Sequence, residues 1–554
     1  MLNTNLELNI NIADDIHLTN RTAANLYAIL GKIAKAHGFK IYIVGGFVRD
    51  LLIYKIHNGY KPYDKLEKPL DIDICVEGDA IIFLEILKIE LYKFENNVYI
   101  HNIKKHERFK TASAVFSSVR ENRINIDFAS ARKEFYAKSG VLPSVKFSDL
   151  EHDLMRRDFS INALALNLGP DNFFKIIDYH NGIKDILAKK IKVLHDLSFI
   201  DDPTRIFRAV RFEKRLGFRI EKNAKKLLID ALSKGVMNNI SGKRISNELN
   251  LIFQENRPEI YFYRLERLGV LKSIDKDLKF TSANKRNFEK ICNFYHSNKA
   301  RINTIKINDI KIKNVNAIKI DIGLLYLMEL LFRLKDEKII SILERLNFGE
   351  NIKKLFLLIK TEFKSIKKIV SYIDNVVEDM DLNDINSKDI SSKDIDSKDI
   401  DNKNIYNKNI SSKEIHSKDI SSKNTDSKNI DNKNIYNKNI SSKNISNTNI
   451  FAAAKNSINF KSRLYLALKP FNLYSIIFFI MRYNNSGYNK YLKIYIFESI
   501  NLKPSISGEE LKKLGFKEGP DIGKILNKLK LLKIDGIIKS KEDEIKYIKT
   551  EYNI

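Results

Sequence analysis

The stretch KIYIVGGFVRDLLIY (Lys40–Tyr54) and the nearby run KPLDIDICVEGD (Lys68–Asp79) decide the fold of this chain. The first predicts a strand that breaks at two glycines into a helix, and the second predicts a strand that carries Asp71 and Asp73. Because residues i and i+2 of a strand point to the same face, the two carboxylates form a pair, while the isoleucines next to them turn toward a core. Paired carboxylates on a rigid strand can hold a metal ion.

The glycine turn between strand and helix predicts a phosphate site beside this pair. Gly45 and Gly46 let the backbone pass close to a ligand, and the free N–H groups at the start of the helix suit a phosphate, with Arg49 one turn further on. Each half of the pattern is common by itself, in half-buried strands and in turns before helices. In this order, the two halves predict a phosphate site next to a metal site.

The surrounding residues predict a small head of alternating helices and strands. Helical spacing covers Asn20–His37 and Gly78–Tyr92, and strand-like runs follow at Asn97–Ile103, Ala112–Ser117 and Arg123–Ala129. Asp127 lies in the last run, where it is either a third carboxylate facing the pair or a strand-end residue on the solvent face. The next segment, Arg132–Val145, mixes charge, glycine and proline, which predicts a mobile loop beside the site.

The segment DLMRRDFSINALAL (Asp153–Leu166) places Arg156, Arg157 and Asp158 at one end of an apolar run that contains Asn162. Adjacent arginines are usually a solvated surface. Here they precede a buried run close to the predicted site, and guanidinium groups bind a triphosphate bidentately. The segment therefore predicts contacts to a triphosphate.

The stretch DDPTRIFRAVRFEKRLGFRIE (Asp201–Glu221) predicts a helix with an aspartate cap and a proline in its first turn. Asp202, Arg205, Arg208 and Arg211 recur in three-residue steps along one side, and on charge alone a basic helix over RNA would account for them. The pairing of Asp202 with Arg205 points further, because a carboxylate that accepts and a guanidinium that donates match an amino group next to a ring nitrogen. Cytosine and adenine display that edge, whereas uracil and guanine present a carbonyl oxygen to the carboxylate, so one pocket accepts CTP and ATP and refuses UTP and GTP.

Composition sets the wider bounds. At 554 residues the chain is too long for one ordinary core, and its formal net charge of +27 predicts a polyanionic partner, either nucleic acid or an anionic membrane surface. No apolar run approaches the length of a membrane span and the first residues lack the features of a signal peptide, so we expect a cytoplasmic protein without a membrane partner. Cys75 and Cys292 are too few for a disulfide framework or a thiolate zinc cluster, and we assign neither a redox role.

The rest of the chain divides by composition. Leu and Ile stripes predict an all-α body from about 250 to 380, with Ile322–Leu334 as core. Between 381 and 450 the sequence repeats in fives around Ile; Lys stands where a pentapeptide solenoid needs a small inward side chain, so we predict a disordered insertion. Leu473–Met481 predicts a buried helix, and the last residues predict short basic helices across a Gly-Pro turn that suit a phosphate backbone.

Taken in order, these motifs resemble those of the class II tRNA nucleotidyltransferase and bacterial poly(A) polymerase family. GGFVRD with DID is similar to the family's GGxVRD and DxD, and RRDFSINA is similar to its RRDFTINA, with Ser160 in place of Thr. DDPTR and RAVRF resemble the family's EDxxR helix, with Asp201 in place of Glu, and ISGKRISNEL (Ile240–Leu249) resembles its fifth motif, which we expect to brace two domains. The resemblance covers about residues 20 to 250 well and the final 50 residues more weakly, and it does not cover the repeat.

The resemblance implies an α+β fold. A small polymerase-β-like mixed-sheet head would be followed by an all-α neck, body and tail in a seahorse-like arrangement, with the disordered insertion in the body. The expected divisions are an N-terminal extension (1–20), a nucleotidyltransferase head (21–175), a neck with the base-recognition helix (176–275), a body (276–380), the repeat (381–450), the body continued (451–502) and an RNA-binding tail (503–554).

The resemblance also implies an enzyme that adds CCA to the 3′ end of tRNA from CTP and ATP, without a nucleic-acid template, and that contacts the tRNA at its acceptor end and elbow. Asp71 and Asp73 would hold two Mg²⁺ ions for in-line attack of the RNA 3′-hydroxyl on the α-phosphate, with Asp127 as a further catalytic carboxylate. The residues expected to bind the nucleotide are Gly46, Arg49 and Arg157 at the triphosphate, Asp202 and Arg205 at the base, and Arg208 and Arg211 at phosphates or as braces of the helix.

Several alternatives stay open. An enzyme that adds only CC or only A, or a poly(A) polymerase, would carry the same residues. A non-catalytic RNA-binding protein on the same scaffold is a different class, which the intact Asp71 and Asp73 disfavour. A nucleotidyltransferase for small molecules would have no use for the large basic helical body.

Overall fold

The structure is a computed structural model that describes residues 21–57, 71–93, 98–118, 121–135, 139–140, 143–303, 320–381, 460–483 and 492–553. The predicted N-terminal extension (1–20) and residues 382–450 of the predicted disordered repeat lie outside the described residues. The chain forms two compact units, one of residues up to 293 together with 322–356, and the other of residues 294–321 and 357–554.

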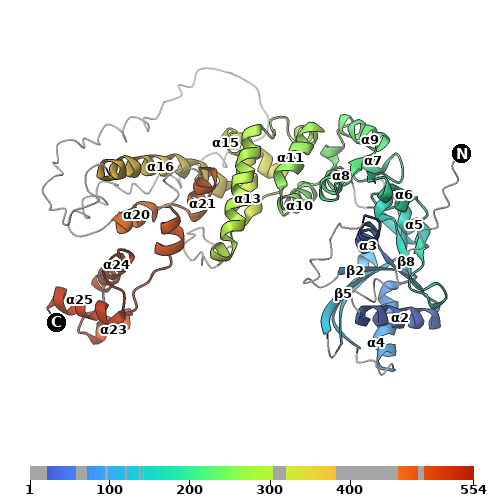
Figure 1. The fold of residues 1–554 in the computed structure, drawn as a ribbon, viewed down its shortest axis with the longest axis horizontal. Coiled ribbons are helices and arrows are strands. Elements are labelled where there is room, and N and C mark those ends of the chain that lie inside the picture. Colours follow the sequence, from blue (N-terminus) through green and yellow to red (C-terminus); the bar gives the residue numbers. More distant parts are fainter. Residues whose placement is uncertain are drawn as a thin grey trace, which may run out of the picture. The chain divides into compact units, whose positions relative to one another are not determined.

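A seven-stranded mixed sheet forms the head of the first unit (Figure 1). In spatial order its strands are β3 (Val98–His106), β4 (Thr111–Ser118), β5 (Glu121–Ser130), β2 (Asp71–Glu77), β1 (Lys40–Val44), β8 (Ala165–Asn167) and β9 (Ile176–Ile177). β2 and β5 run parallel, and the other neighbours in this sheet run antiparallel. The mixed-sheet head and the strands predicted between Asn97 and Ala129 are therefore confirmed.

Helices of the head pack on this sheet. They are α2 (Arg21–Ala36), α3 (Gly46–Ile56) and α4 (Ala80–Glu90). α4 has the apolar sequence AIIFLEILKIE and lies against β2, β4 and β5, where Phe83 packs edge-on against Phe128. Ile72 and Ile74 of β2 are buried, so the residues that alternate with them point to the other face of the sheet.

Short strands and helices continue the first unit beyond the sheet. They are α5 (Leu150–Met155), α6 (Gly182–Leu187), β10 (Lys190–Ile191), α7 (Ser198–Asp201), α8 (Thr204–Arg215), β11 (Arg219–Ile220), α9 (Lys222–Ser233), α10 (Gly242–Phe253), α11 (Pro258–Arg267), α12 (Val270–Ile274), the part of α13 (Ser282–Asn303) up to residue 293, α14 (Ile322–Leu331) and α15 (Asp336–Arg345). α8 packs against α10 and α11, and Tyr326 of α14 joins an aromatic cluster with Phe253, Phe262 and Phe288. The predicted core stripe Ile322–Leu334 is confirmed by the burial of most of α14.

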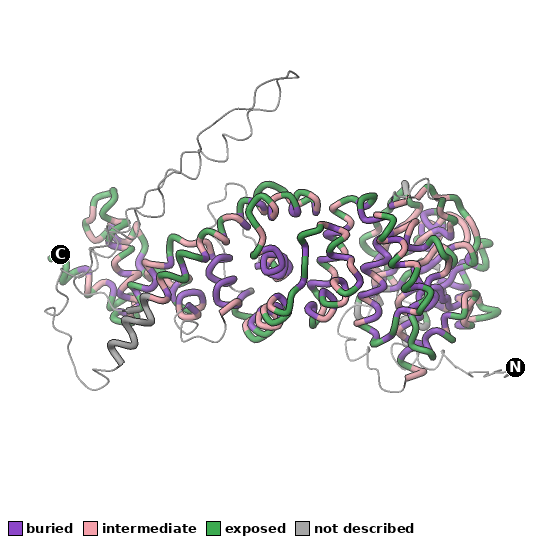
Figure 2. Tube along the Cα trace, turned by 90° about the horizontal axis from the view of Figure 1, so that it is seen from above, coloured by how far each residue is buried: buried purple, intermediate pink, exposed green. Residues whose placement is uncertain are grey.

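The second unit is helical in its described residues. It contains the part of α13 after residue 293, the part of α16 (Glu350–Asp381) after residue 356, α20 (Phe460–Leu468), α21 (Leu473–Arg482), the π-helix η7 (Tyr495–Ser499), α23 (Gly508–Lys513), α24 (Pro520–Ile534) and α25 (Lys541–Tyr552). Every residue of Leu473–Met481 is buried, which confirms the predicted buried helix. In Figure 2 the buried positions follow the inner sides of the helices.

The described helices are short or too polar for a membrane span, and within this part of the chain no single helix is long and apolar enough to cross a membrane. One pair of helices, Lys461–Leu468 and Leu473–Arg482, meets the length and composition criteria together but is bent by 113°.

The C-terminal helices α23, α24 and α25 share a small apolar cluster. It includes Leu511, Leu529 and Ile548, all of which are fully buried. α24 begins at Pro520 directly after Gly519, so the predicted helices on either side of a Gly-Pro turn are confirmed.

The prediction of a loop over Arg132–Val145 is wrong at both ends. β6 (Arg132–Phe135) and β7 (Ser144–Phe147) pair as an antiparallel ribbon outside the main sheet. The exposure of β6 alternates from residue to residue, a period of two that the neighbouring glycine and proline obscured in the sequence. Residues 136–138 and 141–142, between the strands, lie outside the described part of the chain.

Candidate active site

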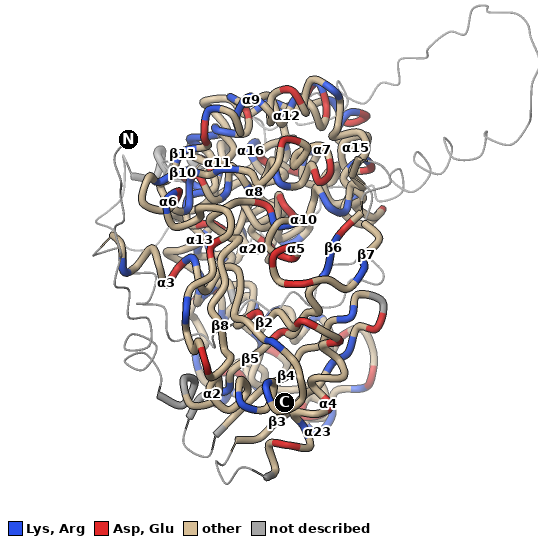
Figure 3. The backbone as a smooth tube through the Cα atoms, turned by 90° about the vertical axis from the view of Figure 1, so that its right-hand side faces the viewer, with Lys and Arg blue, Asp and Glu red and all other residues tan. Residues whose placement is uncertain are grey.

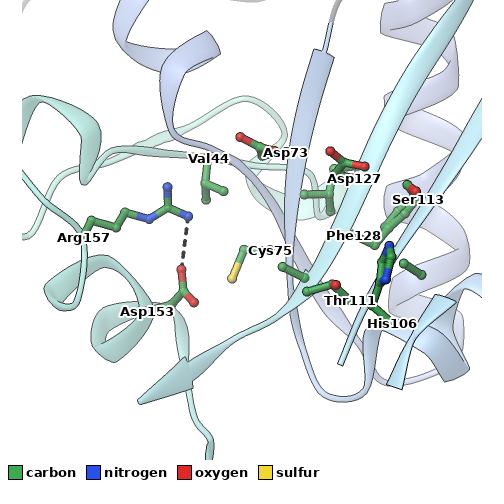
Figure 4. Close-up of a pocket in the computed structure, with 13 residues that line it drawn as sticks. Val44, Asp73, Cys75, His106, Thr111, Ser113, Asp127, Phe128, Asp153 and Arg157 are labelled. Carbon is green, nitrogen blue, oxygen red and sulfur yellow. Dashed lines mark hydrogen bonds and ion pairs between the residues drawn. The ribbon is translucent and has the colours of Figure 1, made fainter. Parts of the chain in front are cut away.

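A pocket of about 350 Å³ lies over β1, β2, β4 and β5 of the head sheet (Figure 4). The polar side chains that line it are those of Asp73, His106, Thr111, Ser113, Asp127, Asp153 and Arg157. Figure 4 shows Asp73 and Asp127 on neighbouring strands, with Arg157 and Asp153 on the other side of the pocket. The pocket thus combines acidic groups from the sheet with a basic group from the residues just after α5.

The sheet register brings two carboxylates together. Asp73 of β2 is directly opposite Asp127 of β5 in the parallel pair, and Ser113 of β4 is opposite Asp127 on its other side. Both aspartates are exposed, while Ile72 and Ile126 beside them are fully buried. Asp127 therefore stands inside its strand next to Asp73, and the strand-end alternative does not describe its position.

Asp71 begins the same strand. Its backbone is opposite Asn125 of β5, two residues before the pair of Asp73 and Asp127. The side chain of Asp71 lies outside what the structure describes. The backbone register alone places Asp71 and Asp73 on one face of β2.

Gly45 is the point where the phosphate turn meets the carboxylates. Its φ of 82° lies in the left-handed region that favours glycine, and it precedes the first residue of α3, Gly46. A Cβ atom at Gly45 would stand 3.1 Å from Nη1 of Arg157 and 3.4 Å from Oδ2 of Asp73. A side chain here would therefore be strained and would crowd the space between the guanidinium and the carboxylate.

Asp153 holds Arg157 through a hydrogen-bonded ion pair. Nη2 of Arg157 donates to Oδ2 of Asp153 at 3.2 Å, and Arg156 donates to Oδ1 of the same buried carboxylate at 2.7 Å. Burial raises the pKa of Asp153, but the charges of Arg156 and Arg157 outweigh it and hold this pKa below its usual value. Nε of Arg157 is buried without a hydrogen-bond partner in the described part of the chain, so Arg157 retains donor capacity next to the pocket.

Arg49 is buried and fully surrounded by protein. It donates from Nε to Asp50 at 2.7 Å and from Nη1 to Oδ1 of Asn162 at 2.7 Å, and its guanidinium lies 4.9 Å from the centre of the Phe212 ring. Asn162 belongs to the 3₁₀ helix η4 (Ser160–Asn162), and Phe212 belongs to α8. In the structure Arg49 therefore connects the helix after the glycine turn to two other elements.

Arg208 of α8 joins the same network. Its Nε donates to Oδ2 of Asp158 at 2.7 Å, and Nδ2 of Asn162 donates to Oδ1 of Asp158 at 2.8 Å. Burial raises the pKa of Asp158, and the Arg208 guanidinium outweighs it, so the carboxyl keeps a pKa below its usual value. The chain Arg49–Asn162–Asp158–Arg208 locks α8 to the head.

Asp202 and Arg205 lie at the start of α8. Oδ1 of Asp202 accepts from the N–H and hydroxyl of Thr204 and from Nη2 of Arg244, the last at 2.7 Å. Arg205 is buried and donates to the Ser198 hydroxyl at 2.6 Å and to the Arg156 carbonyl at 2.7 Å. Among the described residues these bonds use one oxygen of Asp202 and one hydrogen on each terminal nitrogen of Arg205, so both side chains keep unused hydrogen-bonding capacity.

Arg211 points away from this end of the helix. Its Nε donates to Glu255 at 2.9 Å, and Arg215 pairs with the same carboxylate. Glu248 of α10 is a further acid beside α8, and burial raises its pKa because the charges of Arg208 and Arg211 compensate only in part. Arg211 thus pairs with Glu255 of the first unit, while Arg208 is tied to the head.

Sequence reasoning missed several of these partners. Asp153 stands three and four residues before Arg156 and Arg157, a helical spacing that was available as a signal for the ion pairs. Arg244 lies in the motif that we expected to be a brace, and nothing in its local sequence points to Asp202, which lies far away along the chain. Contacts of that kind depend on how helices pack.

The donor set of the pocket fits Mg²⁺. Oxygen atoms of carboxylates are the ligands that this hard cation prefers, and Asp73 and Asp127 present theirs on adjacent strands. Within the described residues no cluster of three or more His, Cys, Asp or Glu side chains is arranged to hold a metal, and the third candidate, Asp71, has no described side chain. A substrate phosphate commonly completes the coordination of Mg²⁺, so two or three carboxylates suffice.

The head sheet thus brings in-register aspartates, a left-handed glycine turn and the start of a helix together beside an arginine. Residues 41–192 match the family model of the poly A polymerase head domain. Residues 217–280 match the model described as the probable RNA and SrmB- binding site of polymerase A. These two matches support the resemblance of residues 41–192 and 217–280 to domains of the tRNA nucleotidyltransferase and bacterial poly(A) polymerase family.

Relatives with curated functions match about half of this chain. The A-adding tRNA nucleotidyltransferase of Geobacter sulfurreducens is 41% identical over 268 residues, which is 48% of this chain and 28% of that protein. The A-adding tRNA nucleotidyltransferase of Halalkalibacterium halodurans is 37% identical over 266 residues, 47% of this chain and 56% of that protein. The chain thus spans about a quarter to a little over half of the length of these relatives.

A solved structure shares the fold over a longer range. A CCA-adding enzyme in an apo form matches with a TM-score of 0.61 at 24% identity, over 97% of this chain and 98% of that chain. This likeness confirms the predicted fold class, a mixed-sheet head followed by helices.

Proposed function

We propose that this protein transfers nucleotides from nucleoside triphosphates to the 3′ end of tRNA. The observation that carries the proposal is that Asp73, Asp127 and Arg157 line one pocket, and that the turn at Gly45 stands against Arg157 and Asp73. Metal-binding carboxylates and a phosphate-binding turn are the parts that nucleotidyl transfer needs, since the reaction consists of positioning and charge stabilisation. Relatives that match about half of the chain are named for activity on tRNA.

The triphosphate would lie over the glycine turn. Among the residues that the structure describes, no side chain caps the first N–H groups of α3, and none pairs with Nε of Arg157, which stands against Gly45. A triphosphate would bind these backbone N–H groups and the Arg157 guanidinium, while buried Arg49 keeps α3 in place through Asn162. Gly46, Arg157 and Arg49 thus serve triphosphate binding, the last by position.

Asp73 and Asp127 would hold Mg²⁺ together with Asp71, which lies two residues before Asp73 at the start of β2. When bound, Mg²⁺ supplies charge stabilisation to the attacking 3′-oxygen and the leaving pyrophosphate. The carboxylates would fix where that charge is supplied, because Asp73 and Asp127 stand in register on adjacent strands. Ser113 and Asp153 complete the polar wall around them.

Base selection would use Asp202 and Arg205. In the described residues the three hydrogen bonds to Asp202 all reach Oδ1, and Oδ2 can accept the exocyclic amino group of cytosine or adenine. Arg205 would donate to the neighbouring ring nitrogen with a hydrogen that its bonds to Ser198 and Arg156 leave over. Arg208 and Arg211 would hold the helix through Asp158 and Glu255 while their remaining nitrogens stay available to phosphates.

Two extents of addition are supported by different observations. The Asp202 and Arg205 edge suits both CTP and ATP, which supports the full CCA addition predicted from the sequence. The names of the two relatives favour addition of the terminal A alone. We favour A addition as the narrower activity, because both relatives carry that name and match about half of this chain with 41% and 37% identity.

A direct test uses the full chain with Mg²⁺, CTP and ATP and three tRNA substrates, ending at the discriminator base, at C and at CC. Addition of one A to the substrate ending in CC, with no product on the other two, supports A addition. Products extended to CCA on all three support full addition, and a CC product or a long A tail would identify the other members of the family. Absence of any product would overturn the proposal and favour a protein that only binds RNA.

A further inference from the structure

The ribbon formed by β6 and β7 presents an aromatic ring between two lysines. In its register Lys133 is opposite Lys146, and Phe135 is opposite Ser144, so these residues share one face. Both Nζ atoms lie 5.7 Å from the centre of the Phe135 ring, and the side chain of Phe135 is 44% exposed. Figure 3 shows basic residues on both strands of the ribbon.

The opposite face of the ribbon is tied to the active-site pocket. Oε1 of Glu134 accepts from Arg132 at 3.2 Å and from Nη1 of Arg156 at 3.0 Å. Arg156 in turn shares the buried Asp153 carboxylate with Arg157, which lines the pocket. A ligand on the exposed face would therefore sit on an element that is fixed to the triphosphate-binding arginine.

This face joins two opposed lysines to an exposed aromatic ring, with both ammonium groups at cation–π distance from the ring. Like charges directly opposite each other in an antiparallel pair repel, and a large exposed aromatic ring gains little from water. A nucleic-acid strand would offset both effects, since its phosphates neutralise the lysines and a base covers the ring. Stacking on an aromatic side chain accepts any base, which suits an RNA end whose last base changes as nucleotides are added.

We propose that Phe135, Lys133 and Lys146 form a stacking platform for the unpaired 3′-terminal base of the RNA substrate. The proposal rests on the proposed function, which supplies a single-stranded RNA end that must reach Asp73 and Asp127. Phe135 holds the base, and the lysines hold the phosphates on either side of it. The platform positions the RNA end and takes no part in the bond exchange.

The test uses a tRNA ending in CC whose last base is replaced by the fluorescent analogue 2-aminopurine. Binding of the full-length protein is expected to quench the fluorescence, because quenching reports stacking. Phe135→Leu keeps an apolar side chain but removes the ring, so it should abolish the quenching and raise the Kd by roughly 10-fold. Phe135→Tyr keeps the ring and should restore both.

Phe147 provides the matched control. It is a 56% exposed aromatic residue of the same ribbon, and its partner Arg132 places it on the opposite face. Phe147→Leu should leave the quenching and the Kd unchanged. Replacement of both lysines by glutamine should reduce the slope of log K against log salt by about 1.4, the value expected for two contacts to a single strand.

The outcomes separate this proposal from the proposed function. Unchanged quenching in Phe135→Leu would overturn the platform, even if the wild-type protein adds nucleotides. Loss of quenching in Phe135→Leu and its recovery in Phe135→Tyr would support the platform, even if the wild-type protein adds none. Loss in both variants together with a lower melting temperature would assign Phe135 a structural role and would also overturn the proposal.

Discussion

The pocket on the head sheet and the basic helix α8 use charged residues in opposite ways. Asp73 and Asp127 are exposed on adjacent strands, and Nε of Arg157, in the same pocket, has no hydrogen-bond partner within the described part of the chain. Along α8, Arg208 and Arg211 each donate from Nε to a carboxylate of the same unit. The pocket keeps capacity for ligands, whereas the helix uses much of its charge to fix its own position.

This difference shows that a sequence motif does not by itself distinguish a residue that binds the ligand from one that supports the structure around it. From the sequence, Arg49 and Arg157 are both predicted to bind a triphosphate through their guanidinium groups. The structure surrounds Arg49 with Asp50, Asn162 and an aromatic ring, and it leaves Arg157 at the pocket wall. Burial and partners, which sequence does not display, separate the two roles.

Removal of a pocket carboxylate should have the largest effect on activity. Asp73→Ala should lower the rate of nucleotide incorporation by about 10³-fold or more, because the metal ligand is lost, while the Kd for tRNA stays within about twofold. Single-turnover incorporation and tRNA binding measure the two effects. Ser113→Ala, in the same pocket, is the matched control and should cost less than about tenfold. More than a tenth of the wild-type rate in Asp73→Ala would contradict the assignment.

Removal of a supporting carboxylate should act on stability. Asp158→Ala leaves Arg208 and Asn162 without their acceptor and should lower the free energy of unfolding by about 3 kcal/mol. Urea unfolding followed by circular dichroism measures it, since the chain has no tryptophan. Asp171→Ala breaks an exposed pair with Lys35 and should change stability by less than about 1 kcal/mol. Equal effects of the two substitutions would show that the buried pair gives no special support.

Asp202 lies between the two extremes, since one oxygen supports the helix start and the other is proposed to select the base. Asp202→Asn replaces an acceptor by an amide that can also donate. The ratio of kcat/KM for UTP and GTP to kcat/KM for CTP and ATP should therefore rise by about 10- to 100-fold. Competition assays with pairs of triphosphates measure the ratio. Thr204→Val removes a donor to Oδ1 only and should leave the ratio within about twofold. An equal change of this ratio in Thr204→Val would contradict the proposed role of Oδ2 of Asp202 in base selection.

The smallest effect is expected at Glu248, where the pKa of the folded state is raised. Below the ordinary pKa of the carboxyl both states are protonated and its burial costs little. As pH rises from the ordinary pKa to the raised one, the carboxyl ionises in the unfolded state but stays protonated in the folded state, which destabilises the protein. Glu248→Gln should therefore match the wild type near pH 4 and exceed its stability at pH 7, by about 1 kcal/mol or less. Urea midpoints at both pH values measure this. A difference of the opposite sign would mean that the ion pairs with Arg208 and Arg211 dominate.

Much of the head was predictable because its signals are local. The helix over Asn20–His37, the strand–turn–helix after Lys40 and the strand with Asp71 and Asp73 follow from periodicity and from glycine. The ribbon of β6 and β7 was missed because its strands are short and flank a segment rich in turn residues. The links from Asp202 to Arg244 and from Arg49 to Asn162 were also missed, since each joins residues far apart in the chain.

The sequence by itself determined that Asp71 and Asp73 share a face and that a glycine turn starts the following helix, because both depend on backbone geometry over a few residues. Only the tertiary structure decided that Asp127 stands beside Asp73, that Arg157 faces the glycine turn and that Arg49 is buried. Strand register and helix packing are set by contacts between distant segments. A local sequence pattern does not reveal such contacts, because they form only when distant segments pack together in the core.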